Sequence, residues 1–352
     1  MKKIEIKELK QFSAEALRKA GVNDENAKII AETLVTTDMF GVCSHGTKNL
    51  LNYILKMQAG GLDPHAEPTI KAEGVSWTVF NGNAGMGMVS GVKAMESAIA
   101  KAKKTGIAYS GVKNSCHFGA AGYYANLAAK HGMIGLSMSN GDPVMTIPNS
   151  SSVAIGNNPF SFAAPLKNGK SVFLDIALSN VAALKVVNAR EKGEKVPKEW
   201  LVDADGNPTD DPSEFPEKSH LRPMAAHKGY GFAVMVELLA SVLTGSGMLS
   251  DVRSWNLDMK TPNNAGHAFI AIDIAQILPM SLFEERMERL ADELHNARKA
   301  KGADRIYLPG ELDWEKYDAA SKSGKLELSD VMVQNMIRLS EMFQLPLNLE
   351  NN

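Results

Sequence analysis

Apolar residues near the start of the chain recur every three to four positions, the spacing of amphipathic helices. This spacing predicts helices at residues 6–20, 24–39 and 48–59, with Asn23 or Asp24 as the cap of the second helix. Glycines end the first and the third helix. A last helix is predicted at 329–343 and should pack on the first three. The segment 41–46, which contains His45, interrupts the helical pattern.

Short apolar runs alternate with helical stretches through the middle of the chain. Two successive units share one plan: a helix end, a glycine, a buried strand and then polar residues, once at 114–115 and once at 139–142. From the residues alone, this repetition favours an α/β domain with a parallel sheet whose polar residues gather at one edge. Strands are predicted at 77–81, 107–112, 133–138, 171–177 and 268–274, and helices at 92–104, 126–130, 182–190, 229–245 and 281–301.

Two of the middle segments have an unusual composition. Residues 192–223 hold five prolines and many charges, which predicts a long surface excursion with little core. Residues 229–245 are strongly apolar, which predicts a helix that is buried on most sides.

The overall composition is ordinary for a globular protein, with 44% apolar and 22% charged residues among 352. This length allows one large domain or two to three small ones. The net charge of −2 argues against binding to nucleic acid or to an anionic membrane. The N-terminus lacks the apolar segment of a secretory signal, and two cysteines in so long a chain indicate a reducing compartment. We therefore expect a cytoplasmic protein.

His117 is the first candidate for chemistry. It follows the strand predicted at 107–112 and precedes Gly119 and Gly122, small residues that leave the backbone open to a ligand. An imidazole beside such a surface is suited to acid/base work, although a capping or core histidine is the structural alternative. His45 is a second candidate, which could meet His117 across a cleft between domains.

Other motifs leave alternatives open. Cys43, His45, Cys116 and His117 could bind zinc, but adjacent ligands on an extended chain point in opposite directions. The glycines at 85–91 resemble a dinucleotide fingerprint with the wrong spacing, so close helix–strand packing is the alternative.

Three further segments could contact a nucleotide. Lys228 and Gly229 begin the apolar helix and could bind a phosphate, or the lysine could simply reach solvent. Asp175 ends a strand, where it could cap the next helix or bind a ribose hydroxyl. The turn at 308–311 could be only a type II turn.

Together these residues resemble the malate/L-lactate dehydrogenase family that lacks the Rossmann fold. The resemblance covers nearly the whole chain, and its relatives include ureidoglycolate dehydrogenase, sulfolactate dehydrogenase, diketogulonate reductase and piperidine-2-carboxylate reductase. It is carried by seven motifs in order, at residues 41–46, 115–121, 156–159, 175–177, 202–209, 227–231 and 308–311.

The resemblance implies an α/β fold with a largely antiparallel, non-Rossmann cofactor domain, and here it overrides the parallel sheet. It implies a helical domain at 1–75 and 315–352, a cofactor domain at 76–314, and a homodimer with its active site near domain and subunit boundaries. The implied activity is interconversion of a small 2-hydroxy acid and its 2-oxo acid with NAD or NADP. NAD is slightly favoured, since Asp175 would disfavour a 2′-phosphate if it faces the ribose.

The resemblance also assigns roles to residues, and it implies no metal. His117 is the acid/base, with His45 as a second catalytic residue. The substrate would be bound by Ser44, His45, Lys48, Asn49 and Tyr53. The cofactor would be bound by Gly141, Asp175, Ile176, Ala177, Lys228, Gly229, Leu308, Pro309, Gly310 and Glu311.

One position departs from the family pattern. Relatives commonly have an arginine four residues after the first histidine, where it can hold the substrate carboxylate, but this chain has Asn49 there. Lys48 could substitute, another residue could bind the carboxylate, or the substrate could differ. The alternatives are a reductase of a cyclic imino acid, a zinc hydrolase using Cys43, His45, Cys116 and His117, and a non-catalytic nucleotide-binding relative.

Overall fold

The computed structural model describes residues 2–351. Within these residues the helices are α1 (Ile6–Lys19), α2 (Asp24–Met39), α3 (Leu50–Gln58), α4 (Gly87–Thr105), α5 (Ala121–Ala129), α6 (Ala183–Lys192), α7 (His227–Glu237), α8 (Met280–His295), α9 (Glu311–Ser323) and α10 (Asp330–Phe343). The strands are β1 (Lys2–Glu5), β2 (Thr69–Glu73), β3 (Trp77–Asn81), β4 (Ile107–Ser115), β5 (Met133–Ser139), β6 (Met145–Thr146), β7 (Val153–Ile155), β8 (Phe160–Pro165), β9 (Ser171–Ile176), β10 (Leu201–Val202), β11 (Pro208–Thr209), β12 (His220–Leu221), β13 (Ala265–Asp273), β14 (Lys325–Leu328) and β15 (Glu350–Asn351).

The largest sheet in the described part of the chain has seven strands in the order β2-β3-β4-β13-β5-β8-β9. Its neighbouring strands are antiparallel except for the pair β3 and β4. Because β13 lies between β4 and β5 and is antiparallel to both, β4 and β5 run in the same direction without pairing. The largely antiparallel, non-Rossmann α/β fold is confirmed, and the parallel sheet favoured by the repeated units is wrong.

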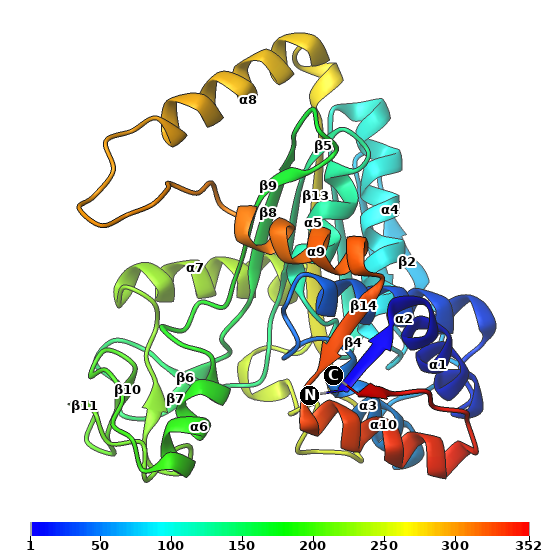
Figure 1. Ribbon diagram of the computed structural model, residues 1–352, viewed down its shortest axis with the longest axis vertical. Helices are drawn as coiled ribbons and strands as arrows, with labels where there is room; N and C mark the ends of the chain where they lie inside the picture. The colour runs from blue at the N-terminus through cyan, green and yellow to red at the C-terminus, as the bar shows by residue number, and fades with distance from the viewer. Residues whose placement is uncertain (1, 352) are drawn as a thin grey trace.

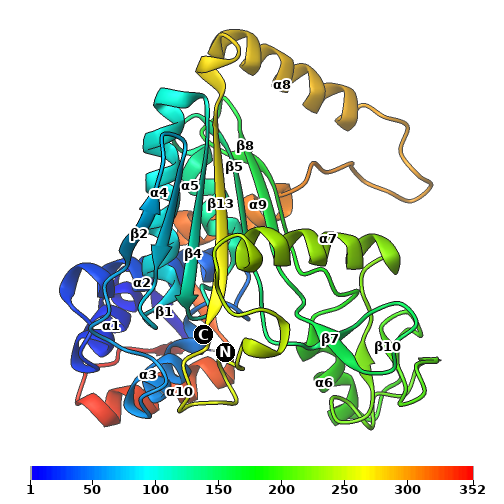
Figure 2. The same ribbon diagram turned by 180° about the vertical axis from the view of Figure 1, so that it is seen from behind.

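Helices cover both faces of this sheet (Figures 1 and 2). α4 and α5 pack on one face, where Met95, Tyr124 and Phe269 belong to one buried apolar cluster. α7 and the π-helical turn Leu238–Val242 pack on the other face. The packing of α5 is close, because a Cβ atom at Gly135 would lie 2.4 Å from the carbonyl oxygen of Ala125.

Elements from both ends of the chain pack together beside the sheet. β1 lies between β14 and β15, and α10 contacts α1 and α3 around a shared apolar cluster. Local signals explain the helix starts, since the Asn23 side chain accepts a hydrogen bond from the Asn26 amide at 2.9 Å and Ser329 caps α10. The packing of the last helix on the early ones is confirmed. The domain boundaries at 75/76 and 314/315 remain a prediction.

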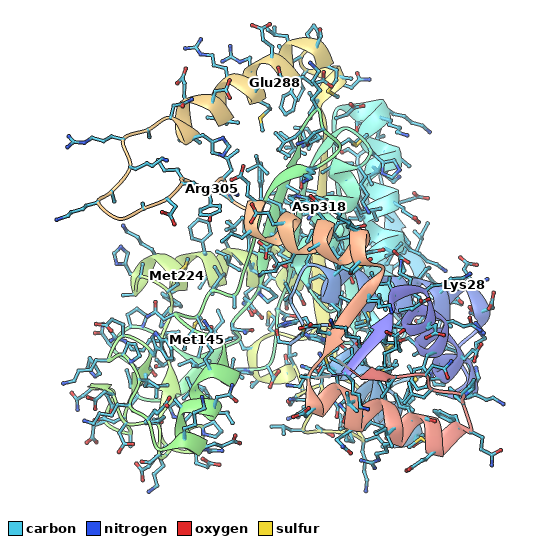
Figure 3. The ribbon with its side chains drawn as sticks, in the orientation of Figure 1. Lys28, Met145, Met224, Glu288, Arg305 and Asp318 are labelled. Atoms are coloured by element: carbon cyan, nitrogen blue, oxygen red, sulfur yellow. The ribbon has the colours of Figure 1, made fainter. Side chains whose placement is uncertain are left out.

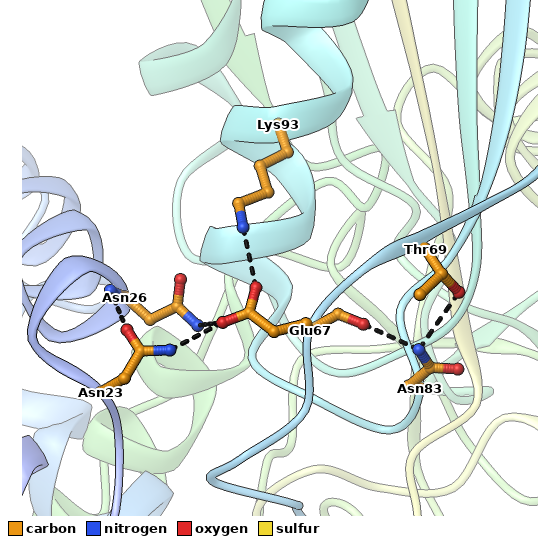
Figure 4. Close-up of polar contacts among 6 residues, drawn as sticks. All are labelled: Asn23, Asn26, Glu67, Thr69, Asn83 and Lys93. Carbon is orange, nitrogen blue, oxygen red and sulfur yellow. Dashed lines mark hydrogen bonds and ion pairs between the residues drawn. The ribbon is translucent and has the colours of Figure 1, made fainter.

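Glu67 joins the helical end to the sheet (Figure 4). Its carboxylate accepts hydrogen bonds from Asn23 at 2.6 Å and Asn26 at 2.7 Å, at the start of α2. The same carboxylate pairs with Lys93 of α4 at 2.8 Å, and the Glu67 carbonyl accepts from Asn83 at 2.7 Å. These bonds fix the connection between α3 and β2 against both parts of the molecule.

The expectation of little core at 192–223 is wrong. The segment forms β10, β11 and β12 in a small sheet with β6 and β7. Leu201, Phe215 and Leu221 are buried in a cluster shared with α7. These apolar residues are widely spaced among prolines and charges, so the pattern hides the core.

The prediction for 229–245 is also corrected. The helix is divided into α7 and the π-helical turn, and Leu238, Val242 and Leu243 are between 51% and 59% exposed. α8 projects from the body, and the chain returns through a segment that includes Arg305 (Figures 1 and 3). No helix in residues 2–351 is long and apolar enough to cross a membrane.

Candidate active site

The backbone that follows β4 is held in place by side chains from other elements. His267 of β13 donates from Nε2 to the carbonyl of Cys116 at 3.1 Å, and Tyr124 of α5 donates to the carbonyl of Phe118. Ser137 of β5 donates to the carbonyl of Ala121 at 2.5 Å. The loop that carries His117 is thus fixed before any ligand binds.

The His117 side chain lies in a group of rings from four segments. Its Nδ1 is 2.6 Å from the hydroxyl oxygen of Tyr53 on α3. Its ring is nearly parallel to Trp255, with centroids 4.4 Å apart, and lies 5.5 Å from the ring of His45. Nε2 has no hydrogen-bond partner among residues 2–351, so it is the ring nitrogen available to a substrate. His117, His45 and Tyr53 therefore come together as the sequence predicted, while their roles stay a prediction.

Burial sets the charge states of this group. It lowers the pKa of His117 well below its usual range, and electrostatic interactions with His45 and His267 act in the same direction. Burial also lowers the pKa of His45 and raises that of Tyr53 well above its usual value. At neutral pH His117 is therefore a neutral imidazole, and its partner Tyr53 is a protonated phenol.

The His45 loop is held by Asp38 of α2. The Asp38 carboxylate accepts hydrogen bonds from the amide of Thr47 at 2.9 Å and from its hydroxyl at 2.5 Å. The other carboxylate oxygen lies against Gly46, where a Cβ atom would be only 1.9 Å away. Burial raises the pKa of Asp38 to about 6, although the bonds from Thr47 lower it. Gly46 is thus required because the carboxylate occupies the space of a side chain.

The other predicted substrate residues lie beside His45. The hydroxyl of Ser44 is 2.9 Å from Nδ1 of His45, and the side-chain amide of Asn49 donates to the main-chain carbonyl of Ser44 at 2.8 Å. Asn335 of α10 donates to the carbonyl of Lys48 at 2.9 Å. Asn49 thus supports the loop through a main-chain contact, and Lys48 is the cationic side chain next to it.

The predicted cofactor segments are connected by hydrogen bonds between main-chain atoms. Leu178, after β9, accepts from Met224 at 2.8 Å, and Met224 accepts from Gly229 at 2.8 Å. Phe173 of β9 donates to the carbonyl of Pro309 at 3.1 Å. The 308–311 turn therefore lies against Phe173 of β9, and the start of α7 is linked through Met224 to Leu178, just after this strand.

Gly141 joins the same region from β5. Its amide donates to the side chain of Asn158 at 3.1 Å, and the neighbouring Asn157 accepts from Leu178 at 2.8 Å. A Cβ atom at Gly141 would have only Asn157 within 4 Å, so the backbone is open on that side. An open backbone between polar side chains fits the close approach of a nucleotide.

Asp175 connects the cofactor segments to the His117 loop. One of its carboxylate oxygens accepts from the amide of Gly122 at 2.8 Å, so it caps α5 rather than the helix that follows in sequence. Burial raises the pKa of Asp175 to about 6, the Gly122 bond lowers it, and nearby Asp313 raises it. Ile176 and Ala177 follow at the end of the strand and are partly exposed.

The turn after the α8 segment is strongly constrained. Gly310 has φ +88°, and a Cβ atom there would lie 2.4 Å from Phe173. The Glu311 carboxylate accepts from the amide of Leu308 at 3.0 Å and pairs with His295 at 2.8 Å. Glu311 therefore holds its own turn closed.

Two segments offered backbone amides that could bind an anion, the start of α7 and the glycines at 85–91. At the start of α7, the amides of Lys228, Gly229 and Tyr230 already donate to carbonyls, whereas the Lys228 side chain is exposed and open to an anion. The glycines at 85–91 serve close packing, since a Cβ atom at Gly87 would lie 2.2 Å from the Cys116 carbonyl. That close contact seats the start of α4 against the His117 loop.

The zinc alternative lacks a suitable ligand cluster. Within residues 2–351, no three His, Cys, Asp or Glu side chains are arranged to hold a metal ion. Cys116 is buried, and burial raises its pKa to about 11, which disfavours the thiolate that zinc binds.

Comparisons with known proteins identify the family of the chain. The profile of the family described as malate/L-lactate dehydrogenase matches residues 4–337. The chain belongs to this family. It is 37% identical to the malate dehydrogenase of Pyrococcus abyssi, over 90% of this chain and 88% of the relative. It is 31% identical to the ureidoglycolate dehydrogenase (NAD(+)) of Escherichia coli strain K12, over 95% of each chain.

A solved structure supports the same assignment. The malate dehydrogenase of Entamoeba histolytica superposes with a TM-score of 0.91 at 31% identity and covers 99% of each chain. The protein is thus a pyridine-nucleotide-dependent dehydrogenase that interconverts hydroxy and oxo acids. The zinc-hydrolase alternative is excluded by this membership.

Several residues of the dehydrogenase site escaped the sequence analysis. Trp255 stacks on His117 from a loop without hydrophobic periodicity, and His267 lies within a buried strand. Asp38 sits in the last turn of a helix and resembles an ordinary surface residue in the sequence. Gly46 was the one sequence signal that pointed to Asp38, because a glycine in a functional loop often marks a place where another group lies close to the backbone.

We expect Gly46→Ala to disrupt the His45 loop. The new methyl group overlaps the Asp38 carboxylate, so the helix end and the loop must separate at a cost of about 1–3 kcal/mol in the free energy of unfolding. Urea unfolding measures this loss. Gly231→Ala is the control, because Gly231, like Gly46, has no positive φ, and it has no atom within 4 Å of its Cβ position. An unchanged stability of Gly46→Ala would contradict the packing of Asp38 against the loop.

Proposed function

We propose that His117 is the acid/base with which this dehydrogenase interconverts a small 2-hydroxy acid and its 2-oxo acid. The observation that supports this role is the pairing of Nδ1 with Tyr53 at 2.6 Å, which leaves Nε2 for the substrate. Since the pKa of His117 is lowered, the ring is neutral and can accept a proton from the hydroxyl group.

Tyr53 suits both protonation states of the ring. For the ring to act as a base, its single hydrogen must be on Nδ1, which donates to the phenolic oxygen of Tyr53 and leaves Nε2 free to accept the substrate proton. In reduction, Nε2–H returns the proton to the carbonyl oxygen of the 2-oxo acid. When bound, the nicotinamide supplies or accepts the hydride at C2 of the acid. The raised pKa of Tyr53 keeps its hydroxyl group intact throughout.

The substrate would lie between the His45 loop and the ring of His117. Ser44 and His45 would contact its polar groups, and Lys48 would attract its carboxylate as a point charge in place of the usual arginine. Asn49 would not bind the carboxylate itself, because its side-chain amide already donates to the Ser44 carbonyl. The relatives named as malate and ureidoglycolate dehydrogenases make malate and ureidoglycolate the first substrates to test.

We propose NAD as the cofactor, held by Gly141, by 175–177, by Lys228 and Gly229, and by the 308–311 turn. Asp175 and Asp313 give this region negative charge, and the turn itself carries the Glu311 carboxylate. Like charges disfavour the 2′-phosphate of NADP. The relative from Escherichia coli is named for NAD(+), which supports the same choice.

We also propose that the dehydrogenase is a homodimer in the cytoplasm. The 16 residues of α8, all within the described chain, include none that is buried, yet Leu282, Leu290 and Leu294 are apolar. Together with Leu238 and Val242, they offer apolar surface that a second copy could cover. The two free cysteines suit a reducing compartment.

The activity is tested by oxidation of NADH and NADPH at 340 nm with oxaloacetate, pyruvate, oxalurate, sulfopyruvate, diketogulonate and piperidine-2-carboxylate. We expect turnover of a 2-oxo acid with NADH preferred. His117→Ala should lower kcat by about 100-fold or more while NADH still binds, because only the proton transfer is lost. The control is His131→Ala, which removes an exposed histidine. Unchanged turnover in His117→Ala would refute the acid/base role, and turnover of the imine alone would favour the reductase alternative.

The lowered pKa of His117 predicts the pH dependence of oxidation. A base must be neutral, so kcat/KM for the hydroxy acid at saturating NAD should stay constant as the pH falls from 8 and decline only below about 6.5, the ordinary histidine value. Initial rates between pH 5 and 8.5 measure the midpoint. A midpoint at or above the ordinary value would contradict a buried, neutral His117.

The homodimer is tested by sedimentation velocity. We expect a mass near twice 38.0 kDa. The double variant Leu238→Asp and Val242→Asp places charges on the apolar face and should shift the protein to monomer. Val75→Asp is the control, since Val75 is 82% exposed and lies elsewhere. A monomer in the unmodified protein would refute the proposal.

A further inference from the structure

Lys56 is a fully buried lysine on α3, three residues after Tyr53. Its ammonium group donates to the carbonyl of Asp258 and, at 2.8 Å, to the carbonyl of Thr261. Within residues 2–351 it is in no ion pair with a carboxylate. A fully buried lysine is rare and its burial is costly, so the contacts that it makes require an explanation.

Both carbonyls belong to the loop at residues 253–263, here called the Trp255 loop. The Asp258 carboxylate accepts from the amides of Lys260 at 3.2 Å and Thr261 at 3.0 Å, which forms a turn whose carbonyls face Lys56. At the base of the loop, Arg253 donates to the carbonyl of Asn263 at 2.9 Å. The loop is therefore closed at its base and attached to α3 through the ammonium group near its tip.

A second close contact holds the same loop from the end of α3. A Cβ atom at Gly61 would lie 2.3 Å from the carbonyl oxygen of Met259. Leu257, by contrast, is 84% exposed. The Trp255 loop thus depends on Lys56 and on the space at Gly61 rather than on a large apolar contact of its own tip.

The loop carries one ring into the site. Trp255 stacks on His117 at 4.4 Å with 14° between the planes, and on Tyr53 at 5.1 Å with 30°. The indole therefore covers a face of the imidazole and touches the phenol that binds Nδ1. Rotation of the His117 ring about its χ2 bond would collide with the indole, so the indole keeps Nε2 directed at the substrate.

We propose that Lys56 is a positioning residue that holds the Trp255 loop, so that Trp255 fixes the plane of the His117 ring. The proposal rests on the proposed acid/base role of His117. Lys56 touches neither substrate nor the reacting atoms and acts only through the loop and its indole. Loss of the hydrogen bonds between Lys56 and the Trp255 loop frees the indole. The imidazole can then rotate away from the geometry that proton transfer needs.

The test compares variants at two levels. Lys56→Met keeps the volume of the side chain and removes the charge, and we expect kcat to fall by about 10-fold or more with KM changed by less than about 3-fold. Acrylamide quenching of Trp255 fluorescence, taken as the difference from Trp255→Phe, should increase. Trp255→Leu should reproduce the loss of kcat. Trp255→Phe keeps an aromatic face, so it should retain most of the wild-type kcat.

Lys101→Met is the matched control. Lys101 of α4 also binds a carbonyl, that of Gly74 at 2.8 Å, and pairs with Glu73 at 2.9 Å next to β2, outside the Trp255 loop. It should leave kcat and the quenching of Trp255 unchanged. Gly61→Ala is the second variant, because it displaces the loop without touching the ammonium group. We expect the same loss of kcat and the same increase in quenching, and this variant replaces Lys56→Met in the test if Lys56→Met does not fold.

Two results would overturn the proposal. One is wild-type kcat and quenching in folded Lys56→Met or, where it does not fold, in Gly61→Ala. The other is an equal loss of kcat in Lys101→Met, which would indicate a general effect on stability. The quenching measurement needs no turnover. An active His117→Ala enzyme would therefore refute the acid/base role while leaving the clamp between Lys56 and the loop open to test.

Discussion

The site depends on one buried histidine in the central strand. His267 of β13 donates from Nε2 to the carbonyl of Cys116 at the end of β4, and its Nδ1 is 2.8 Å from the hydroxyl of Ser139 at the end of β5. Burial lowers the pKa of His267 to about 3, so the ring stays neutral and its Nδ1 accepts from Ser139. One uncharged ring thereby ties together three strand ends from which His117 and Gly141 emerge.

This arrangement follows from the insertion of β13 between β4 and β5. The two strands run in the same direction without pairing, so both deliver polar residues to one edge of the sheet. The amide groups behind that edge are satisfied by buried side chains, since Glu237 accepts from Asn140 at 3.1 Å and from Asn158 at 3.0 Å. Such networks hold backbone geometry firmly because each unpaired member would be costly. The antiparallel sheet therefore still provides the shared edge that a parallel sheet would have offered.

Helix starts and ends could be predicted from the sequence, because they depend on caps and glycines that lie within a few residues of each other. Asn23 caps a helix through its own side chain, and Gly106 ends one with a φ of +80°. The position of β13 could not be predicted in the same way, because it pairs with strands more than 120 residues earlier in the chain. His117, His45 and Tyr53 were found because chemistry and a family resemblance single them out. Lys56 and Trp255 were missed because one lies within a helical pattern and the other on a loop without a pattern.

Burial explains why a histidine in this group suits acid/base work. Desolvation alone would leave His117 neutral and weakly basic, so few rings would carry the proton that reduction of the 2-oxo acid requires. The indole face of Trp255 at 4.4 Å favours the imidazolium, since an aromatic face attracts a cation by about 1–2 kcal/mol where water is excluded. The carboxylate of a bound 2-oxo acid would act in the same direction, so the ring would gain its proton only when a substrate needs it.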